Sequence, residues 1–170
     1  YCRDHVSTQG SLCYVTYRFE LREDLLYADD ECFRLAGLDR TTREVVSQDV
    51  AFQLSRIADP DVGSPVIEPF SNILGFSAFG QRLPARRVAD PKLIFRPVHE
   101  QYAAVGGIAG VVTPSIQVLE ITLHRAYPQI KYWFAMEFTT PVPWEAVLVY
   151  DGKEGRPRFD DHPVGTGPYV

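Results

Sequence analysis

The side chains best suited to catalysis are the four histidines, His5, His99, His124 and His162. Nucleophilic catalysis needs a nucleophile, a base and a group that orients the base. No histidine stands in an H-E-x-x-H sequence or beside a G-x-S-x-G sequence. Asp160 and Asp161 precede His162, but a solvated loop of mixed charge is the simpler interpretation of this cluster. The sequence therefore predicts no catalytic residue and no enzyme.

The cysteines Cys2, Cys13 and Cys32 lack the spacing of a metal site. No pair is C-x-x-C and no histidine stands at a zinc-ligand offset nearby, so we expect no metal. In an oxidising compartment one disulfide and one remaining thiol would result. Three buried thiols, acting as small apolar side chains, are an equal alternative. The cysteines alone do not identify the compartment.

Two glycine-rich stretches could suggest a phosphate-binding loop. The stretch Gly106–Gly110 lacks the G-x-G-x-x-G order. Gly165-Thr166-Gly167 is followed by Pro168, which removes a backbone donor where a phosphate would need one. Tight turns of the backbone account for both stretches. We expect no cofactor.

Charge and hydropathy exclude two classes of partner. The chain has 17 Lys and Arg residues against 22 Asp and Glu residues, a net charge of −5, with the signs interspersed. A nucleic-acid-binding surface needs a basic stripe, so no nucleic-acid partner is expected. No apolar run approaches the length of about 18 residues that suggests a membrane span. With 170 residues, 45% of them hydrophobic, the chain can bury one core or two small ones.

The elements that would position any site are a few strands and helices. Cys13 to Arg22 alternates apolar and polar residues and predicts a strand. Ile116 to Leu123 predicts another strand, after Pro114 ends the glycine-rich apolar stretch. Val50, Leu54, Ile57 and Ala58 form one apolar face of a helix that starts near Ser47, its expected N-cap, and stops at Asp59-Pro60.

The other segments give weaker signals. A helix is expected to begin at Tyr127-Pro128 and to be buried over most of its surface. Another short helix is expected over Trp144 to Tyr150. Val66 to Phe79 predicts short helical turns with aromatic packing. Glu31 to Arg43 and Gln81 to Asp90 are interpreted as loops because they are polar and contain turn residues or several arginines.

Four segments, in order, resemble one family. They are D-V-x-F-x-L-x-R-I-A-D-P-x-x-x-S-P (49–65), A-Y-P-Q (126–129), F-T-T-P-V-P-W-E-A-V (138–147) and H-P-V-G-T-G-P-Y (162–169). Together they resemble the extracytoplasmic solute-binding proteins of peptide- and nickel-type ABC importers, the family 5 solute-binding proteins. The resemblance covers nearly the whole chain from Tyr14 onward.

This resemblance implies a mixed α/β (α+β) fold. The chain would be part of lobe I of a type II periplasmic-binding-protein-like fold, including its extra subdomain. Residues 1–45 would supply a strand and an extended segment of the lobe core. Residues 46–160 would form a helix-rich extra subdomain with a small sheet, and residues 161–170 would return to the lobe core. All of them would belong to a single partial lobe.

The resemblance also implies a function. The protein would bind an oligopeptide-like solute outside the cytoplasm, in the periplasm or at the cell surface, for an ABC transport system. Its partners would be a peptide or other small solute, the permease subunits and a second lobe of the same protein, with a secretion signal upstream. The alternative is a structural or interaction module derived from such a domain.

The expected ligand-binding residues follow from the same resemblance. They are Val66, Phe70, Gly165, Thr166 and Tyr169. Val66 follows the Ser-Pro pair at a position that is often aromatic in the family, so its smaller side chain offers less surface to a peptide. A purely structural turn is an equal alternative for the residues around Thr166.

Overall fold

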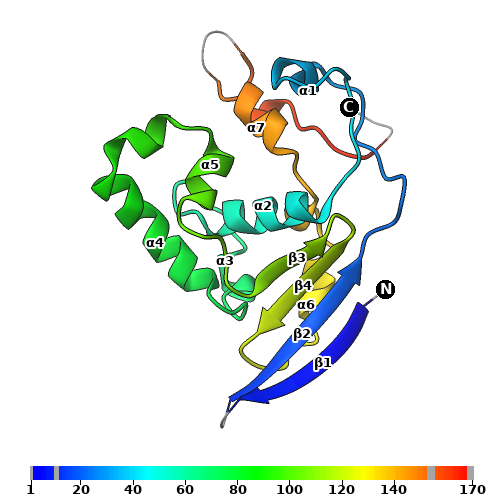
Figure 1. Cartoon of the computed structure of the whole chain (residues 1–170), viewed down its shortest axis with the longest axis vertical. Coiled ribbons are helices and arrows are strands. Elements are labelled where there is room, and N and C mark those ends of the chain that lie inside the picture. Colours follow the sequence, from blue (N-terminus) through cyan, green and yellow to red (C-terminus); the bar gives the residue numbers. More distant parts are fainter. Residues whose placement is uncertain (1, 10–11, 153–155, 168–170) are drawn as a thin grey trace.

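A four-stranded antiparallel sheet forms one side of the molecule (Figure 1). The computed structural model describes residues 2–9, 12–152 and 156–167, with side chains described from Tyr14 onward. The strands are β1 (Cys2–Gln9), β2 (Leu12–Glu20), β3 (Val111–Ser115) and β4 (Val118–Leu123), in the order β1-β2-β4-β3. The longest described helices are α2 (Ser47–Ala58) and α4 (Phe76–Ala89). Helix α2 packs against β3 and β4.

Strand β2 confirms the alternation seen in the sequence. Val15 and Tyr17 are buried and lie opposite Leu123 and Ile121 of β4. On the other face, the hydroxyl groups of Thr16 and Thr122 are 3.0 Å apart, and Arg18 Nη1 donates to Glu120 Oε1 at 2.7 Å. The apolar face joins the core while the polar face forms cross-strand pairs.

Strand β3 corrects the expectation that Pro114 ends its segment. Pro114 lies within β3, where the pairing with β4 shifts register between Val112 and Ser115. A proline cannot donate a ladder hydrogen bond, so an irregularity of this kind is where a strand tolerates it. Strand β4 begins at Val118, two residues later than the sequence predicts.

Helix α2 is confirmed, but Ser47 is not its N-cap. The N-cap is Val46, whose backbone N–H donates to Asp49 Oδ2 at 3.0 Å. Ser47 is the first helical residue, and its hydroxyl donates to the carbonyl oxygen of Ser115 at 2.6 Å. The last helical residue is Ala58 and Asp59 is the C-cap, so the helix stops where Asp59-Pro60 predicts.

Two predicted loops contain helices. Helix α1 (Glu31–Leu35) begins where Asp30 Oδ1 accepts a hydrogen bond from the Cys32 backbone N–H at 2.7 Å. Helix α4 runs through most of the arginine-rich segment 81–90, for which the sequence predicts a loop, with Pro84 inside the helix. Its buried residues are Phe76, Phe79 and Leu83, and their spacing of three and four residues is that of an amphipathic helix.

The remaining helices are short. They are α3 (Ile67–Phe70), η1 (Pro91–Phe95), α5 (Val98–Ala103), α6 (Ile130–Trp133), η2 (Glu137–Thr139), α7 (Trp144–Val149) and η3 (Phe159–Asp161). Helix α3 and helix α7 were expected. The helix expected from Tyr127-Pro128 is present as α6 but starts at Ile130. The expectation that it is buried over most of its surface is wrong, because Ile130 is buried but Tyr132 is 75% exposed.

The apolar side chains form two clusters. The larger cluster joins β2, β4, α2, α3 and α4. The smaller cluster brings the segment after β2 together with α7, and its buried residues are Tyr27, Cys32, Phe33, Val45, Ala146, Val149 and Val164. Cys32 is a free thiol with no exposed surface, which agrees with the buried-thiol alternative for this cysteine.

Candidate functional site

The predicted ligand-binding residues lie in two separate places. Val66 is 6% exposed and Phe70 is fully buried, both in the larger cluster, where Phe70 contacts the ring of Phe134. Gly165 adjoins the segment before α1, since its carbonyl oxygen accepts a hydrogen bond from the Ala28 N–H at 2.8 Å. Thr166 is exposed. Tyr169 lies outside the described residues, so a ligand role for these five residues stays a prediction.

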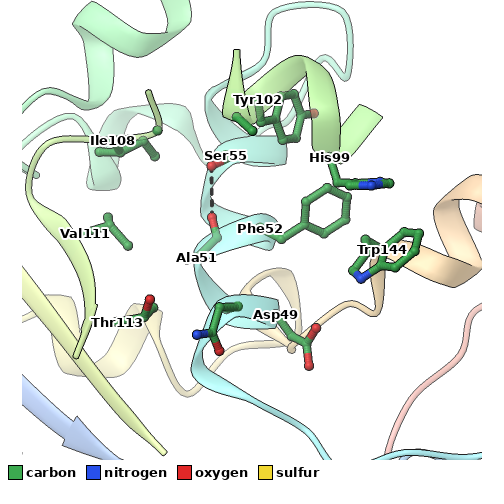
Figure 2. A pocket seen from close by; sticks show the side chains of 13 residues that line it. Asp49, Ala51, Phe52, Ser55, His99, Tyr102, Ile108, Val111, Thr113 and Trp144 are labelled. Carbon is green, nitrogen blue, oxygen red and sulfur yellow. Dashed lines mark hydrogen bonds between the residues drawn. The ribbon is translucent and has the colours of Figure 1, made fainter. Parts of the chain in front are cut away.

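A cavity of about 470 Å³ opens elsewhere, between α2, α5, the start of α7, strand β3 and the segment that leads into β3 (Figure 2). Helix α2 forms its floor because Gln48, Phe52 and Ser55 recur at i, i+4 and i+7. The core-facing residues of the same helix lie on another face. Helix α2 therefore serves the hydrophobic core and the cavity at once.

The deep wall of the cavity is apolar and buried. Tyr102 and Ile108 are each 4% exposed, and the ring of Tyr102 lies 5.6 Å from the ring of Phe52. The Tyr102 hydroxyl donates to Asp59 Oδ2 at 3.0 Å, so its polar end is already bound. Tyr102 thus offers the cavity its ring and not its hydroxyl group.

His99 and Trp144 face each other at one side of the cavity (Figure 2), with ring centroids 4.0 Å apart and planes inclined by 45°. Burial lowers the pKa of His99, against the opposing influence of Glu100 and Glu145. The imidazole is therefore neutral at pH 7.

One carboxylate lines the cavity, and it is fully engaged. Arg43 donates to both oxygens of Asp49, at 2.8 Å and 2.7 Å, and to both oxygens of Glu145, at 2.7 Å each. Asp49 and Glu145 are both 2% exposed. These carboxylates stabilise the contact between α2 and α7 and are not free to act as a base.

A second polar cluster ties the last described segment to α1. Asp30 Oδ1 accepts a hydrogen bond from the Tyr150 hydroxyl at 2.6 Å, and Asp30 Oδ2 lies 3.0 Å from His162 Nε2. His162 is therefore paired and half-buried, which corrects its interpretation as part of a solvated loop, while Asp160 and Asp161 are exposed. Within the described part of the chain, no group of three or more His, Cys, Asp or Glu residues could hold a metal ion.

Sequence reasoning missed the cavity residues Phe52, Tyr102 and Trp144 as a group. One signal was present: Phe52 lies on α2 outside the apolar stripe formed by Val50, Leu54 and Ile57, as an extra aromatic residue on a polar face. The partners of Phe52 come from α5 and α7, distant in the sequence. The spacing of residues within one segment cannot predict that these distant segments meet.

Comparison with known proteins identifies the fold. The family model described as "Bacterial extracellular solute-binding proteins, family 5 Middle" matches residues 14–170. A search of curated proteins gave no significant match. In the described ranges, no helix is both long and apolar enough to cross a membrane.

Three solved structures illustrate the likeness. They are OppA of Burkholderia pseudomallei (TM-score 0.57, 18% identity), the substrate-binding domain of an oligopeptide ABC transporter of Bacillus anthracis (0.56, 19%) and the murein tripeptide binding protein MppA of Escherichia coli (0.52, 18%). Each match covers 98% of this chain and 25% of the solved chain. The chain spans about a quarter of the length of these proteins. The predicted mixed α/β, periplasmic-binding-protein-like fold is confirmed.

Proposed function

Because the chain belongs to the family 5 bacterial extracellular solute-binding proteins, we propose that it forms part of the first lobe of a receptor for oligopeptide-like solutes in an ABC import system. The family match over residues 14–170 carries this proposal. The fold likeness to proteins described as oligopeptide- or murein tripeptide-binding supports the class of solute. The protein acts as a binder and not as an enzyme.

The solute is held in the gap between this lobe and a second lobe, which closes over it by hinge motion. Thr166 and Gly165 supply accessible surface on this side of the gap, and Tyr169 is the third ligand residue proposed from this part of the sequence. Val66 and Phe70 lie apart from these residues, buried in the larger cluster, where they pack the core of the lobe. The permease subunits and the second lobe are the protein partners, and the receptor works in the periplasm or at the outer face of the cell.

Calorimetry with a pool of oligopeptides tests this function. The whole receptor, with its second lobe, is expected to bind at least one pool tightly, while the 170-residue chain binds every pool weakly or not at all. In the whole receptor, Thr166→Arg should reduce peptide affinity because it places a bulky charge at the gap. Ser77→Arg, on the exposed face of α4, is the matched control and should leave affinity unchanged.

Two outcomes would contradict the proposal. Tight peptide binding by the 170-residue chain would show that one lobe is sufficient. A whole receptor that binds no peptide would favour the structural or interaction module, for which the burial of Val66 at an often aromatic position is the supporting observation.

A further inference from the structure

The cavity over α2 contains hydrogen-bonding groups that nothing in the described chain satisfies. His99, Thr113 and Trp144 line it and are each half-buried, yet their side chains make no hydrogen bond to another described residue. Trp133 shows the contrast, since its Nε1–H donates to the Tyr127 hydroxyl at 3.1 Å. Because no described protein group forms a hydrogen bond with them, these side chains are available to form hydrogen bonds with a ligand in the cavity.

The rest of the lining is apolar and largely aromatic. Phe52 and Tyr102 form adjacent ring surfaces 5.6 Å apart between their centroids, and Ile108 and Val111 close the opposite side (Figure 2). The volume of about 470 Å³ is within the range of small-molecule sites. Ring faces and edges of this kind bind planar aromatic groups through offset-stacked or edge-to-face contacts.

The charges around the cavity disfavour an ionised ligand. Asp49 is the carboxylate in the lining, and both of its oxygens are bound by Arg43. His99 is neutral at pH 7 because burial lowers its pKa. A charged ligand group would lose its hydration and find no free countercharge among the lining residues, which is costly.

We propose that this cavity binds an uncharged aromatic group carrying a single hydrogen-bonding substituent, of which phenol is the simplest example. The ring lies among Phe52, Tyr102 and Ile108, and the substituent bonds to His99, Thr113 or the Trp144 Nε1–H. None of the five residues proposed for solute capture between the lobes lines this cavity. The site is therefore distinct from the proposed function and does not depend on it.

The tryptophan side chains provide a direct test by NMR. The chain contains two, Trp133 and Trp144, so a ¹⁵N-labelled sample gives two indole N–H signals, which the Trp133→Phe variant assigns. Titration with p-cresol is expected to shift the Trp144 signal in a saturable way at submillimolar to millimolar concentration. The chemical shift of the Trp133 signal should not change, because this indole N–H is already hydrogen-bonded to the Tyr127 hydroxyl.

A pair of neighbouring alanines gives matched variants. Ala103 lines the cavity and is exposed at the end of α5, whereas Ala104 is exposed and outside the lining. Ala103→Phe fills the mouth of the cavity and should weaken p-cresol binding at least about tenfold, a change of about 1.4 kcal/mol. Ala104→Phe should bind p-cresol with the same affinity as the unmodified chain. A well-dispersed NMR spectrum of this variant will show that the fold tolerates the added ring.

Further ligands distinguish the source and the charge of the group. If the chain binds both N-acetyltyrosinamide and p-cresol, the natural ligand is a tyrosine side chain of a peptide. If it binds p-cresol alone, the natural ligand is a free aromatic compound. Either result supports the site. Benzoate and benzylamine should bind at least about tenfold more weakly than p-cresol. The proposal is overturned if p-cresol leaves the Trp144 signal unmoved, if Ala103→Phe binds it normally, or if either ion binds as tightly.

Discussion

Arg43 connects α2 to α7 by binding a carboxylate of each helix. It is 15% exposed and forms ion pairs with two carboxylates, Asp49 and Glu145, that are almost completely buried. Its guanidinium group also lies 5.1 Å from the centroid of the Tyr27 ring and 5.7 Å from that of Phe33. One side chain thus links the smaller apolar cluster to the start of α2.

Arg43→Ala is expected to lower the free energy of unfolding by about 3–5 kcal/mol, because it leaves two buried carboxylates without a countercharge. Urea denaturation followed by circular dichroism measures this change. Arg34→Ala is the control: Arg34 pairs with Glu31 at 3.8 Å, both side chains are more than half exposed, and such a pair contributes about 0–1 kcal/mol. Equal losses in the two variants would contradict the role assigned to Arg43.

Sequence reasoning identified only half of this arrangement. The helix predicted to start near Ser47 contains Asp49, and in the structure Asp49 lies in the first turn of α2, where a carboxylate suits the helix dipole. Arg43 was assigned to a loop without a role. The contact to Glu145 spans 102 residues, and no local pattern indicates a pair of that separation.

Helices α2 and α4 approach each other closely at Gly80. A Cβ atom at Gly80 would come within 2.7 Å of the Ala58 carbonyl oxygen, at the last residue of α2. That oxygen belongs to the backbone, so it cannot move away cheaply. The absence of a side chain at Gly80 sets how closely the two helices pack.

Gly80→Ala is therefore expected to destabilise the protein, although Ala favours a helix over Gly by about 1 kcal/mol. Steric overlap in a packed interior costs about 1–3 kcal/mol, which exceeds that gain. Thermal unfolding should show a lower Tm for Gly80→Ala. Ser77→Ala, exposed in the same helix, should leave the Tm unchanged or slightly higher, and a raised Tm for Gly80→Ala would refute the close approach.

The elements that could be predicted were those with one clear period. Strand β2 alternates strictly, and α2 carries an uninterrupted apolar stripe. Helix α4 was missed because Pro84 and three arginines hide its stripe of Phe76, Phe79 and Leu83. One of these arginines, Arg87, is bound to Asp59 at 2.9 Å, a partner on the far side of the preceding loop.

The two apolar clusters should differ in local stability. The larger cluster is framed by the sheet and by α2 and α4, whereas the smaller one relies on α1, α7 and the segments beside them. Regions with fewer buried apolar contacts open at lower free energy.

Native-state hydrogen exchange should therefore show amides of α1 and α7 exchanging at a lower free energy than amides of β2 and β4. Phe33→Ala, in the smaller cluster, should speed exchange in α1 and α7 while leaving the sheet protected. Ile121→Ala, in the sheet, should lower protection throughout. Uniform exchange free energies in the unmodified chain would show that the clusters unfold as one unit.

The resemblance to the family, and with it the mixed α/β fold, could be predicted because four short segments occur in the family's order. Four motifs in the right order are more specific than any one of them alone. The cavity over α2 could not be foreseen in this way. It arises where Phe52, Tyr102 and Trp144 meet, and only tertiary packing brings them together.

The pairing of β2 with β4 has a consequence for how the chain is made. Until the ribosome has made β4, β2 can pair with β1, but the side of β2 that will receive β4 stays open. Such a ribbon is slow to complete and prone to associate with other nascent chains. Chaperones that bind nascent chains at the ribosome should therefore raise the yield of native protein more than chaperones that act after the chain is released.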